Sequence, residues 1–225
     1  MNKRLKYCCE LIPWQGKGFA DIGTDHAQVP IWLAENGYSG YIYASDIAKD
    51  PLSRAKAAAS NAGVSENIHF EQCDGLDSCP AEMVDCILIA GMGGDNICRI
   101  LDRCEWIFQG DHLFIFQPMT HPEVLRYWLI HNEFKIIREA VITEGERIYQ
   151  IFAAEVGKTR AYLDSEYFTG AADVLHEGEP RSLLLSMLQK QFESLFSDLP
   201  LSRVNEESST RFLYSVYEEL NTKPA

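Results

Sequence analysis

The sequence lacks a hydrophobic run long enough to cross a membrane. Its longest nearly uncharged apolar stretch, Met83–Met92, contains Asp85 and falls far short of the roughly 20 apolar residues that a transmembrane helix needs. The basic start at Lys3, Arg4 and Lys6 is followed by polar residues and cysteines instead of a continuous apolar region, so we expect no secretory signal. We therefore expect a cytoplasmic protein with no membrane partner.

The sequence also lacks the spacings of metal and redox sites. None of its seven cysteines forms a C-x-x-C pair, and an odd number argues against a complete set of disulfides. The six histidines show no metal-ligand spacing with cysteine or carboxylate partners. We expect reduced cysteines that fill apolar space, and no metal.

Positive charge is scarce: 20 Lys and Arg stand against 33 Asp and Glu, for a net charge of −13. Phosphate contacts usually come from Lys and Arg, so this total does not favour an RNA partner. A local basic patch is still available from Lys3, Arg4, Lys6, Lys17 and Arg126. At 46% hydrophobic and 24% charged, the composition is that of an ordinary globular protein.

Short apolar runs alternate with amphipathic segments between residues 17 and 155, which predicts an α/β domain with a largely parallel sheet. The predicted strands are Gly18–Ile22, Gly40–Ser45, Ile68–Gln72, Met83–Ala90 and His112–Phe116. One helix is predicted from a capping Asp50 to about Gly63, and another from Pro122 to His131. The second helix has Val124, Leu125, Trp128 and Leu129 as its predicted core residues.

The end of this region departs from the alternation. Phe134–Thr143 and Arg147–Val156 are strand-like and separated by a short glycine-containing turn, which predicts an antiparallel hairpin. Five parallel strands closed by an antiparallel pair is the order found in class I methyltransferases, although dehydrogenases and response regulators also alternate.

Helical spacing returns after the hairpin, in Arg181–Phe196 and Asn205–Leu220, with a turn predicted at Ser197–Val204. Leu184, Leu188, Phe192 and Leu195 share one predicted apolar stripe. We predict two domains, a ligand-binding α/β domain at 1–156 and an antiparallel helical hairpin at 157–225.

Acidic and glycine residues follow four predicted strands. The first carries Asp21 and leads into Gly23, and the second ends at Asp46, 23 residues after that glycine. An acidic side chain at about this interval can accept from both hydroxyls of a ribose. The third strand is followed by Asp74 and Gly75, where Asp74 could accept from an adenine amino group. The fourth leads into a loop with three glycines, and all four ends should share one edge of the sheet.

The loop after the first strand does not fit a dinucleotide. The G-x-G-x-x-G pattern fails because Asp25 and Gln28 stand where the second and third glycines belong, which disfavours an NAD-dependent dehydrogenase. Two carboxylates, Asp21 and Asp25, would repel phosphate but tolerate a ligand that carries an ammonium and a sulfonium.

These strings resemble the bacterial tRNA adenine-22 N1-methyltransferases, class I enzymes that use S-adenosylmethionine. The resemblance runs from Arg4-Leu5 to about Phe152. It rests on ADIGTDHAQVP (20–30), SDI (45–47), CDGL (73–76), IAGMGG (89–94), QP (117–118), LRYWL (125–129) and IYQI (148–151). It implies a Rossmann-like seven-stranded class I methyltransferase sheet with an appended helical C-terminal domain that grips tRNA. The implied products are tRNA methylated at N1 of adenine 22 and S-adenosylhomocysteine.

The resemblance also implies residue roles. Cofactor binding falls to Asp21, Gly23 and His26 at the methionine end, Asp46 and Ile47 at the ribose, Asp74 and Gly75 at the adenine, and Ala90, Gly91 and Met92. The implied substrate contacts are Gly93, Gly94 and Gln117, and the basic patch adds Arg126 and Lys6 as candidate RNA contacts.

The methyl transfer requires a carboxylate near the target adenine more than it requires a general base. N1 of neutral adenine already carries a lone pair, so attack on a sulfonium methyl needs alignment and charge placement. A carboxylate that accepts from the adenine amino group would raise the nucleophilicity of N1 and stabilise the cationic product. Asp25 and Asp95 are the candidates. Because N1 lies on the pairing edge, the target base must be unpaired or extruded.

Two other functions stay open from the sequence. One keeps the cofactor but methylates a small molecule or a protein, and it is favoured if tRNA accepts no label while cofactor binding is intact. The other is a non-catalytic adaptor with a degenerate pocket, favoured if no cofactor binds. A monomer and a weak dimer are both compatible with the sequence.

Overall fold

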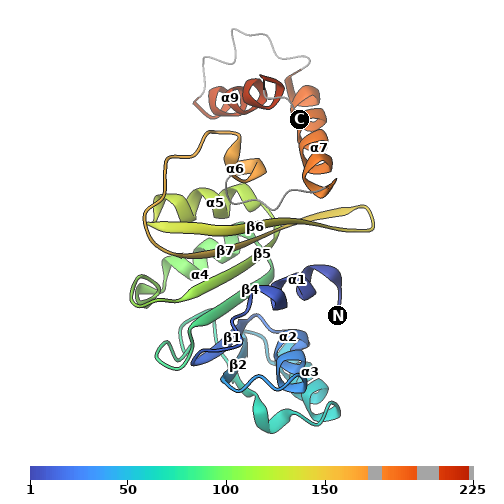
Figure 1. The fold of residues 1–225 in the computed structure, drawn as a ribbon, viewed down its shortest axis with the longest axis vertical. Helices are drawn as coiled ribbons and strands as arrows, with labels where there is room; N and C mark the ends of the chain where they lie inside the picture. The colour runs from blue at the N-terminus through green and yellow to red at the C-terminus, as the bar shows by residue number, and fades with distance from the viewer. Residues whose placement is uncertain (172–178, 197–207, 223–225) are drawn as a thin grey trace.

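A seven-stranded sheet forms the centre of the computed structural model, which describes residues 1–171, 179–196 and 208–222 (Figure 1). The strands are β1 Gly18–Ile22, β2 Tyr41–Asp46, β3 His69–Gln72, β4 Cys86–Gly93, β5 Leu113–Thr120, β6 Phe134–Glu144 and β7 Arg147–Val156. Their order is β3-β2-β1-β4-β5-β7-β6, with β1 to β5 paired in parallel and β7 antiparallel to both β5 and β6. The predicted Rossmann-like sheet closed by a hairpin is confirmed.

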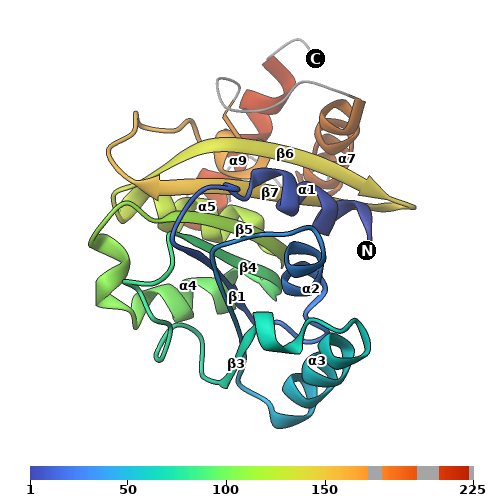
Figure 2. The ribbon, with the colours of Figure 1, turned by 60° about the horizontal axis from the view of Figure 1, so that its bottom comes forward.

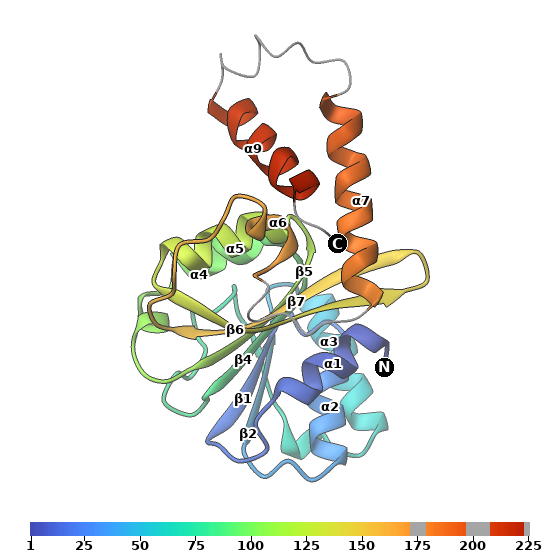
Figure 3. The same ribbon diagram turned by 45° about the horizontal axis from the view of Figure 1, so that its top comes forward.

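Helices cover both faces of the sheet, which explains why its central strands are almost entirely apolar. These helices are α1 Lys3–Leu11, α2 Gln28–Glu35, α3 Lys49–Asn61, α4 Gly94–Asp102 and α5 Pro122–His131. Figure 3 shows α1, α2 and α3 on one side of the sheet, and α4 and α5 on the other. Each side has its own apolar cluster, with Leu33 and Leu88 in the first and Phe114 and Leu125 in the second. Two short 3-10 helices, Ser65–Asn67 and Glu105–Phe108, complete the connections.

Two details of the predicted helices are wrong. Asp50 does not cap α3, because the helix begins at Lys49 and Asp50 lies in its first turn, where a carboxylate still suits the helix dipole. In α5, Leu125 and Leu129 are fully buried but Val124 is 38% exposed. The inward side of α5 takes Arg126 as well, a residue that hydrophobic spacing does not select.

The C-terminal helices are α6 Glu166–Thr169, α7 Glu179–Phe196 and α9 Ser208–Thr222, which lie beyond the β6 edge of the sheet (Figures 1 and 2). Leu184, Leu188 and Phe192 of α7 pack against Val216 of α9, and Val141 of β6 joins the same cluster. Leu195, predicted in the buried stripe, is 52% exposed. The predicted turn at 197–204 lies outside the described residues.

All seven cysteines are buried and carry free thiols. Within the described ranges, no helix combines the length and apolar composition required to cross a membrane.

Candidate functional site

Two adjoining cavities lie at the carboxyl ends of the parallel strands. The larger, of about 340 Å³, is lined by Gly23, Asp46, Ile47, Asp74, Gly75 and Met92 among others. The smaller, of about 210 Å³, is lined by Asp21, Gly23, His26, Ala90 and Gly91 among others. Gly23 lines both, so the cavities meet at the loop after β1. Every residue that the sequence suggested for cofactor binding therefore lines one of these two adjoining cavities.

The loop after β1 needs a glycine at position 23. Gly23 has a φ of +78°, and a Cβ there would lie 2.1 Å from Cε of Met92. Two non-glycine residues of the same loop, Asp25 and Ala27, also take left-handed φ values of 41° and 50°. Such conformations are costly for residues with a Cβ and are found most often where a loop serves a site.

Asp21 is a buried carboxylate on the wall of the smaller cavity. It is 6% exposed, and the hydroxyl of Thr24 donates a 2.7 Å hydrogen bond to its Oδ2. Burial, helped by the negative charge of the nearby Asp46, raises the pKa of Asp21 to about 7 despite the lowering effect of the hydrogen bond from Thr24. A cation placed beside Asp21 would restore its ionised form, so the position suits an ammonium group.

Asp46 joins the loops after β1 and β2. Its Oδ1 accepts from the backbone N–H of Ala48 at 2.9 Å, and its Oδ2 accepts from that of Asp25 at 3.4 Å. A carboxylate has about four lone-pair positions, so these two bonds leave room for two ligand hydroxyls. Ile47 beside it is 61% exposed and adds apolar surface to the larger cavity.

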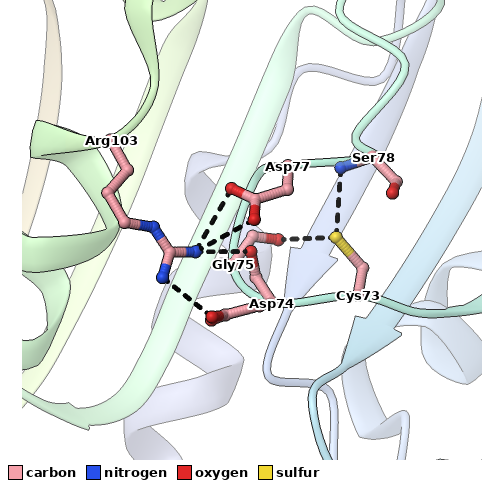
Figure 4. A network of polar contacts seen from close by, with 6 residues as sticks. All are labelled: Cys73, Asp74, Gly75, Asp77, Ser78 and Arg103. Atoms are coloured by element: carbon pink, nitrogen blue, oxygen red, sulfur yellow. Dashed lines mark hydrogen bonds and ion pairs between the residues drawn. The ribbon is translucent and has the colours of Figure 1, made fainter.

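Arg103, just after α4, lines the larger cavity, and Figure 4 shows its polar contacts. Its guanidinium donates to Oδ2 of Asp74 at 2.8 Å, to the Asp74 carbonyl at 3.0 Å and to Asp77 at 3.2 Å. The hydrogen bond from Arg103 holds the pKa of Asp74 below its usual range. Sequence reasoning missed Arg103, because no spacing connects the end of this helix to the loop after β3.

The two candidate catalytic carboxylates occupy different places. Asp25 lines the smaller cavity and pairs with Arg54 of α3 at 2.7 Å. Asp95 lies in the first turn of α4 and accepts a hydrogen bond from Nδ1 of His121, the residue before α5. That bond raises the pKa of His121 and lowers that of Asp95. Asn96, the next residue after Asp95, lines the larger cavity.

The loops after β4 and β5 touch beside this pair. A Cβ on Gly94 would lie 2.1 Å from the carbonyl oxygen of His121, so only glycine permits the approach. Gly93 pairs with Thr120 at the end of β5. The predicted substrate loop is therefore the end of an extended β4 followed directly by the first residue of α4, and the close approach at Gly94 brings Asp95 to His121.

Comparison with known proteins decides the family. A model described as a methyltransferase domain matches residues 1–152. The tRNA (adenine(22)-N(1))-methyltransferase of Bacillus subtilis is 34% identical over 164 residues, which are 73% of this chain and 68% of that protein. The chain belongs to the tRNA (adenine-22 N1)-methyltransferase family.

Solved structures of the family share the whole fold. The B. subtilis m1A22 tRNA methyltransferase TrmK superposes with a TM-score of 0.78 at 25% identity, covering 98% of this chain and 96% of that one. A Streptococcus pneumoniae protein solved in complex with S-adenosyl-L-methionine gives 0.78 at 25% identity, covering 98% of both chains. The C-terminal helices are thus included in the likeness.

In this member of the family, two predicted RNA contacts are wrong. Arg126 is 1% exposed, and its Nε donates to Glu139 at 2.8 Å. Its other nitrogens donate to the carbonyl of Tyr167 and, at 2.7 Å, to Oε1 of Gln150. A guanidinium so enclosed is unavailable to a phosphate.

Gln117 is also fully buried, on β5. Its amide nitrogen donates to the Pro118 carbonyl at 2.9 Å, and its Oε1 accepts from the guanidinium of Arg4. Gln117 binds the side chain of Arg4 and is fully buried, so it does not contact substrate. Lys6, in contrast, is exposed on α1, as the predicted basic patch requires.

Proposed function

We propose that the chain transfers a methyl group from S-adenosylmethionine to N1 of adenine 22 in tRNA and releases S-adenosylhomocysteine. One observation carries the proposal. The residues that the sequence suggested for cofactor binding line two adjoining cavities, in a chain 34% identical to a B. subtilis enzyme named for this reaction.

The charges along the cavities fit S-adenosylmethionine, which supplies a sulfonium methyl when bound. Asp21 would bind the ammonium, because a cation beside it relieves the burial of its charge. Asp46 would accept from the ribose hydroxyls. Asp74 and Gly75 would lie at the adenine: Gly75 has a φ of +63° and a Cβ there would lie 2.8 Å from Ile100, so a glycine lets this turn pack against Ile100 on the wall of the larger cavity.

Asp95 is the carboxylate that we propose for the target base. Asp25 is held by Arg54 beside the smaller cavity, where it shapes the methionine end together with His26. Asp95 is half exposed next to the larger cavity and is kept ionised by His121. Accepting from the adenine amino group, it would draw electron density toward N1 and stabilise the cation that forms there.

The tRNA would approach along α1 and the C-terminal helices. Lys3 and Lys6 are exposed on α1 and line a further cavity against β6. We propose that residues 1–156 bind the cofactor and that residues 157–225 grip the tRNA in the cytoplasm. Adenine N1 is a pairing atom, so the base must leave its helix to enter the site.

Incubation with S-adenosylmethionine and an unmodified tRNA transcript, followed by digestion to nucleosides, tests the reaction. We expect N1-methyladenosine in a molar amount equal to S-adenosylhomocysteine. N6-methyladenosine, or no methylated nucleoside from a protein that binds the cofactor, contradicts the proposal. A D95N variant should lower kcat by about 10- to 1,000-fold, with little change in cofactor affinity.

A further inference from the structure

A third cavity, which we call the α7 cavity, lies where the C-terminal helices meet α5 and β7. It has a volume of about 370 Å³. Its lining includes Met187 and Leu195 of α7, Phe168 of α6, Gln150 of β7 and His121 just before α5. Side chains from the sheet and from the C-terminal helices therefore enclose one space.

The lining of the α7 cavity does not suit a phosphate. Its described residues include no Lys or Arg, and Glu123 adds a carboxylate. The histidine of the lining, His121, already donates a hydrogen bond to Asp95. A nucleic acid would therefore enter this cavity with an uncharged part, a base, and keep its phosphates outside.

The helix α7 contributes exposed apolar side chains to the cavity. Met187 is 45% exposed and Leu195 is 52% exposed, whereas Leu188 and Phe192 between them are buried in the cluster that α7 forms with α9. The rings of Phe168 and Phe192 also line the cavity, edge to face with centroids 5.4 Å apart. Aromatic and apolar surfaces of this kind receive the faces of unstacked bases in RNA-binding proteins.

Two amide side chains complete the lining. Gln150 is 8% exposed, its Oε1 accepts from Arg126 at 2.7 Å, and its Nε2 donates to the carbonyl of Phe168 at 3.3 Å. These bonds fix Gln150 as part of the wall. Gln191 of α7 lines the same cavity and is exposed. An amide both donates and accepts, which matches the mixed hydrogen-bonding edge of a base.

His121 connects the α7 cavity to the carboxylate that we propose for the target adenine. It lines the cavity, it donates to Asp95, and its carbonyl oxygen packs against Gly94. A base that leaves its stack to reach Asp95 deprives the neighbouring base of a stacking partner. Because consecutive nucleotides are covalently linked, that neighbour must lie close to Asp95, and the α7 cavity begins at the residue bonded to Asp95.

We propose that the α7 cavity binds the base of a nucleotide directly next to adenine 22 in the tRNA, and so holds the RNA chain open at the target. This rests on the proposed function. The C-terminal helices would then contact an uncharged base near the reacting atom, while exposed Lys3 and Lys6 on α1 contact phosphates elsewhere.

The test combines a change in the protein with a matching change in the RNA. Wild type and M187S/L195S are titrated, with S-adenosylhomocysteine present, against labelled tRNAs that are intact or lack the base immediately 5′ or 3′ of adenine 22. Loss of both apolar side chains should weaken binding of intact tRNA by about 5- to 100-fold. At one of the two abasic positions, both proteins should bind within about 2-fold of each other, because the base that the side chains contact is gone.

A matched variant and two further measurements make the result specific. L183S makes a similar change at a 52% exposed leucine of α7 outside the described cavity lining, and it should bind every tRNA like wild type. All three proteins should bind S-adenosylhomocysteine equally. The slope of log affinity against log salt should be the same for M187S/L195S and wild type, because no phosphate contact is removed.

Several outcomes overturn the assignment. Equal affinity of wild type and M187S/L195S for intact tRNA excludes the contact, and an equal loss with every abasic tRNA excludes a neighbouring base as the occupant. A wild-type dimer that sediments without tRNA and is lost in M187S/L195S makes this face an interface between two copies of the chain instead. If wild type binds intact tRNA without methylating it, the proposed function fails, while the comparison of affinities still decides the role of the α7 cavity.

Discussion

Nδ1 of His121 donates a hydrogen bond to the carboxylate of Asp95, and this pair connects the loop after β5 to the first turn of α4. Because a carboxylate can only accept, Nδ1 carries the hydrogen in both charge states of the imidazole. Asp95 therefore stays oriented throughout, and only the net charge of the pair changes with pH.

That change predicts a pH dependence of kcat. The hydrogen bond raises the pKa of His121, so the pair is neutral below that pKa and carries one negative charge above it. If Asp95 stabilises the cationic product, kcat at saturating cofactor and tRNA should rise as His121 loses its proton. H121N keeps a donor and tolerates the left-handed φ of 51°, so its kcat should vary less between pH 6 and 8. Identical pH profiles for the two proteins would refute this role.

Asp46 should contribute strongly to cofactor affinity. Replacing it with Ala removes charge-assisted bonds to the ribose hydroxyls, worth about 1.5–3 kcal/mol, and also frees the backbone N–H of Ala48. Calorimetry should show a loss of about 10- to 100-fold for S-adenosylhomocysteine. E66A, an exposed acidic residue in the 3-10 helix before β3, is the matched control. Unaltered affinity in D46A would exclude the assignment.

Asp21 should destabilise the cofactor-free protein at neutral pH. Its pKa is raised to about 7 in the folded state, so the free energy of unfolding falls as pH rises from about 4 to about 7. Relative to D21N, wild type should lose about 2 kcal/mol between pH 5 and pH 8, measured by urea unfolding. D21N should also bind S-adenosylmethionine more weakly, because the ammonium loses its partner. A pH-independent difference between the two proteins would argue against a buried titrating group.

Arg126 should govern stability, with no direct effect on RNA binding. R126M leaves the buried carboxylate of Glu139 without its 2.8 Å partner and should cost about 3–5 kcal/mol. The double variant R126M/E139Q should recover part of the loss, and K135M at an exposed site on β6 should be neutral. Under conditions where R126M is folded, its tRNA affinity should match that of wild type. A loss of tRNA affinity in the folded variant would support the expectation from the sequence that Arg126 contacts RNA.

Binding of tRNA should be weak and sensitive to salt. The chain carries a net charge of −13, so attraction must come from a local patch such as exposed Lys3 and Lys6 on α1. K6Q should reduce the slope of log affinity against log salt by about one phosphate contact. Between 50 and 200 mM salt, a protein with about 6–10 phosphate contacts loses about 10³- to 10⁵-fold in affinity. A tRNA affinity that does not change over this interval would contradict the basic patch.

The strands and the cofactor site could be predicted because their signals are local. β1 matches its prediction at both ends, and the acidic or glycine residues after four strands meet at one edge because parallel strands place their ends there. β4 differs: it runs from Cys86 to Gly93, since Met92 and Gly93 continue to pair with β5 after register shifts that follow Ala90 and Met92. Glycine-rich composition alone predicts a loop at that point.

The errors involve side chains whose partners are distant in sequence. Arg126 is buried because Glu139 and Gln150 of the hairpin enclose it, and neither position is marked by a helical pattern. Gln117 looks like a polar residue at a substrate mouth until Arg4, more than a hundred residues earlier, is placed against it. Charge and position along the chain therefore identified the residue types but not their surroundings.

Methyl transfer to two matched tRNA transcripts tests the central claim most directly. One transcript carries adenine at position 22, the other carries guanine there, and both are incubated with methyl-labelled S-adenosylmethionine and the purified protein. We predict label in the adenine transcript alone, recovered as N1-methyladenosine. Equal labelling of both transcripts, or label in neither while the cofactor still binds, would contradict the account.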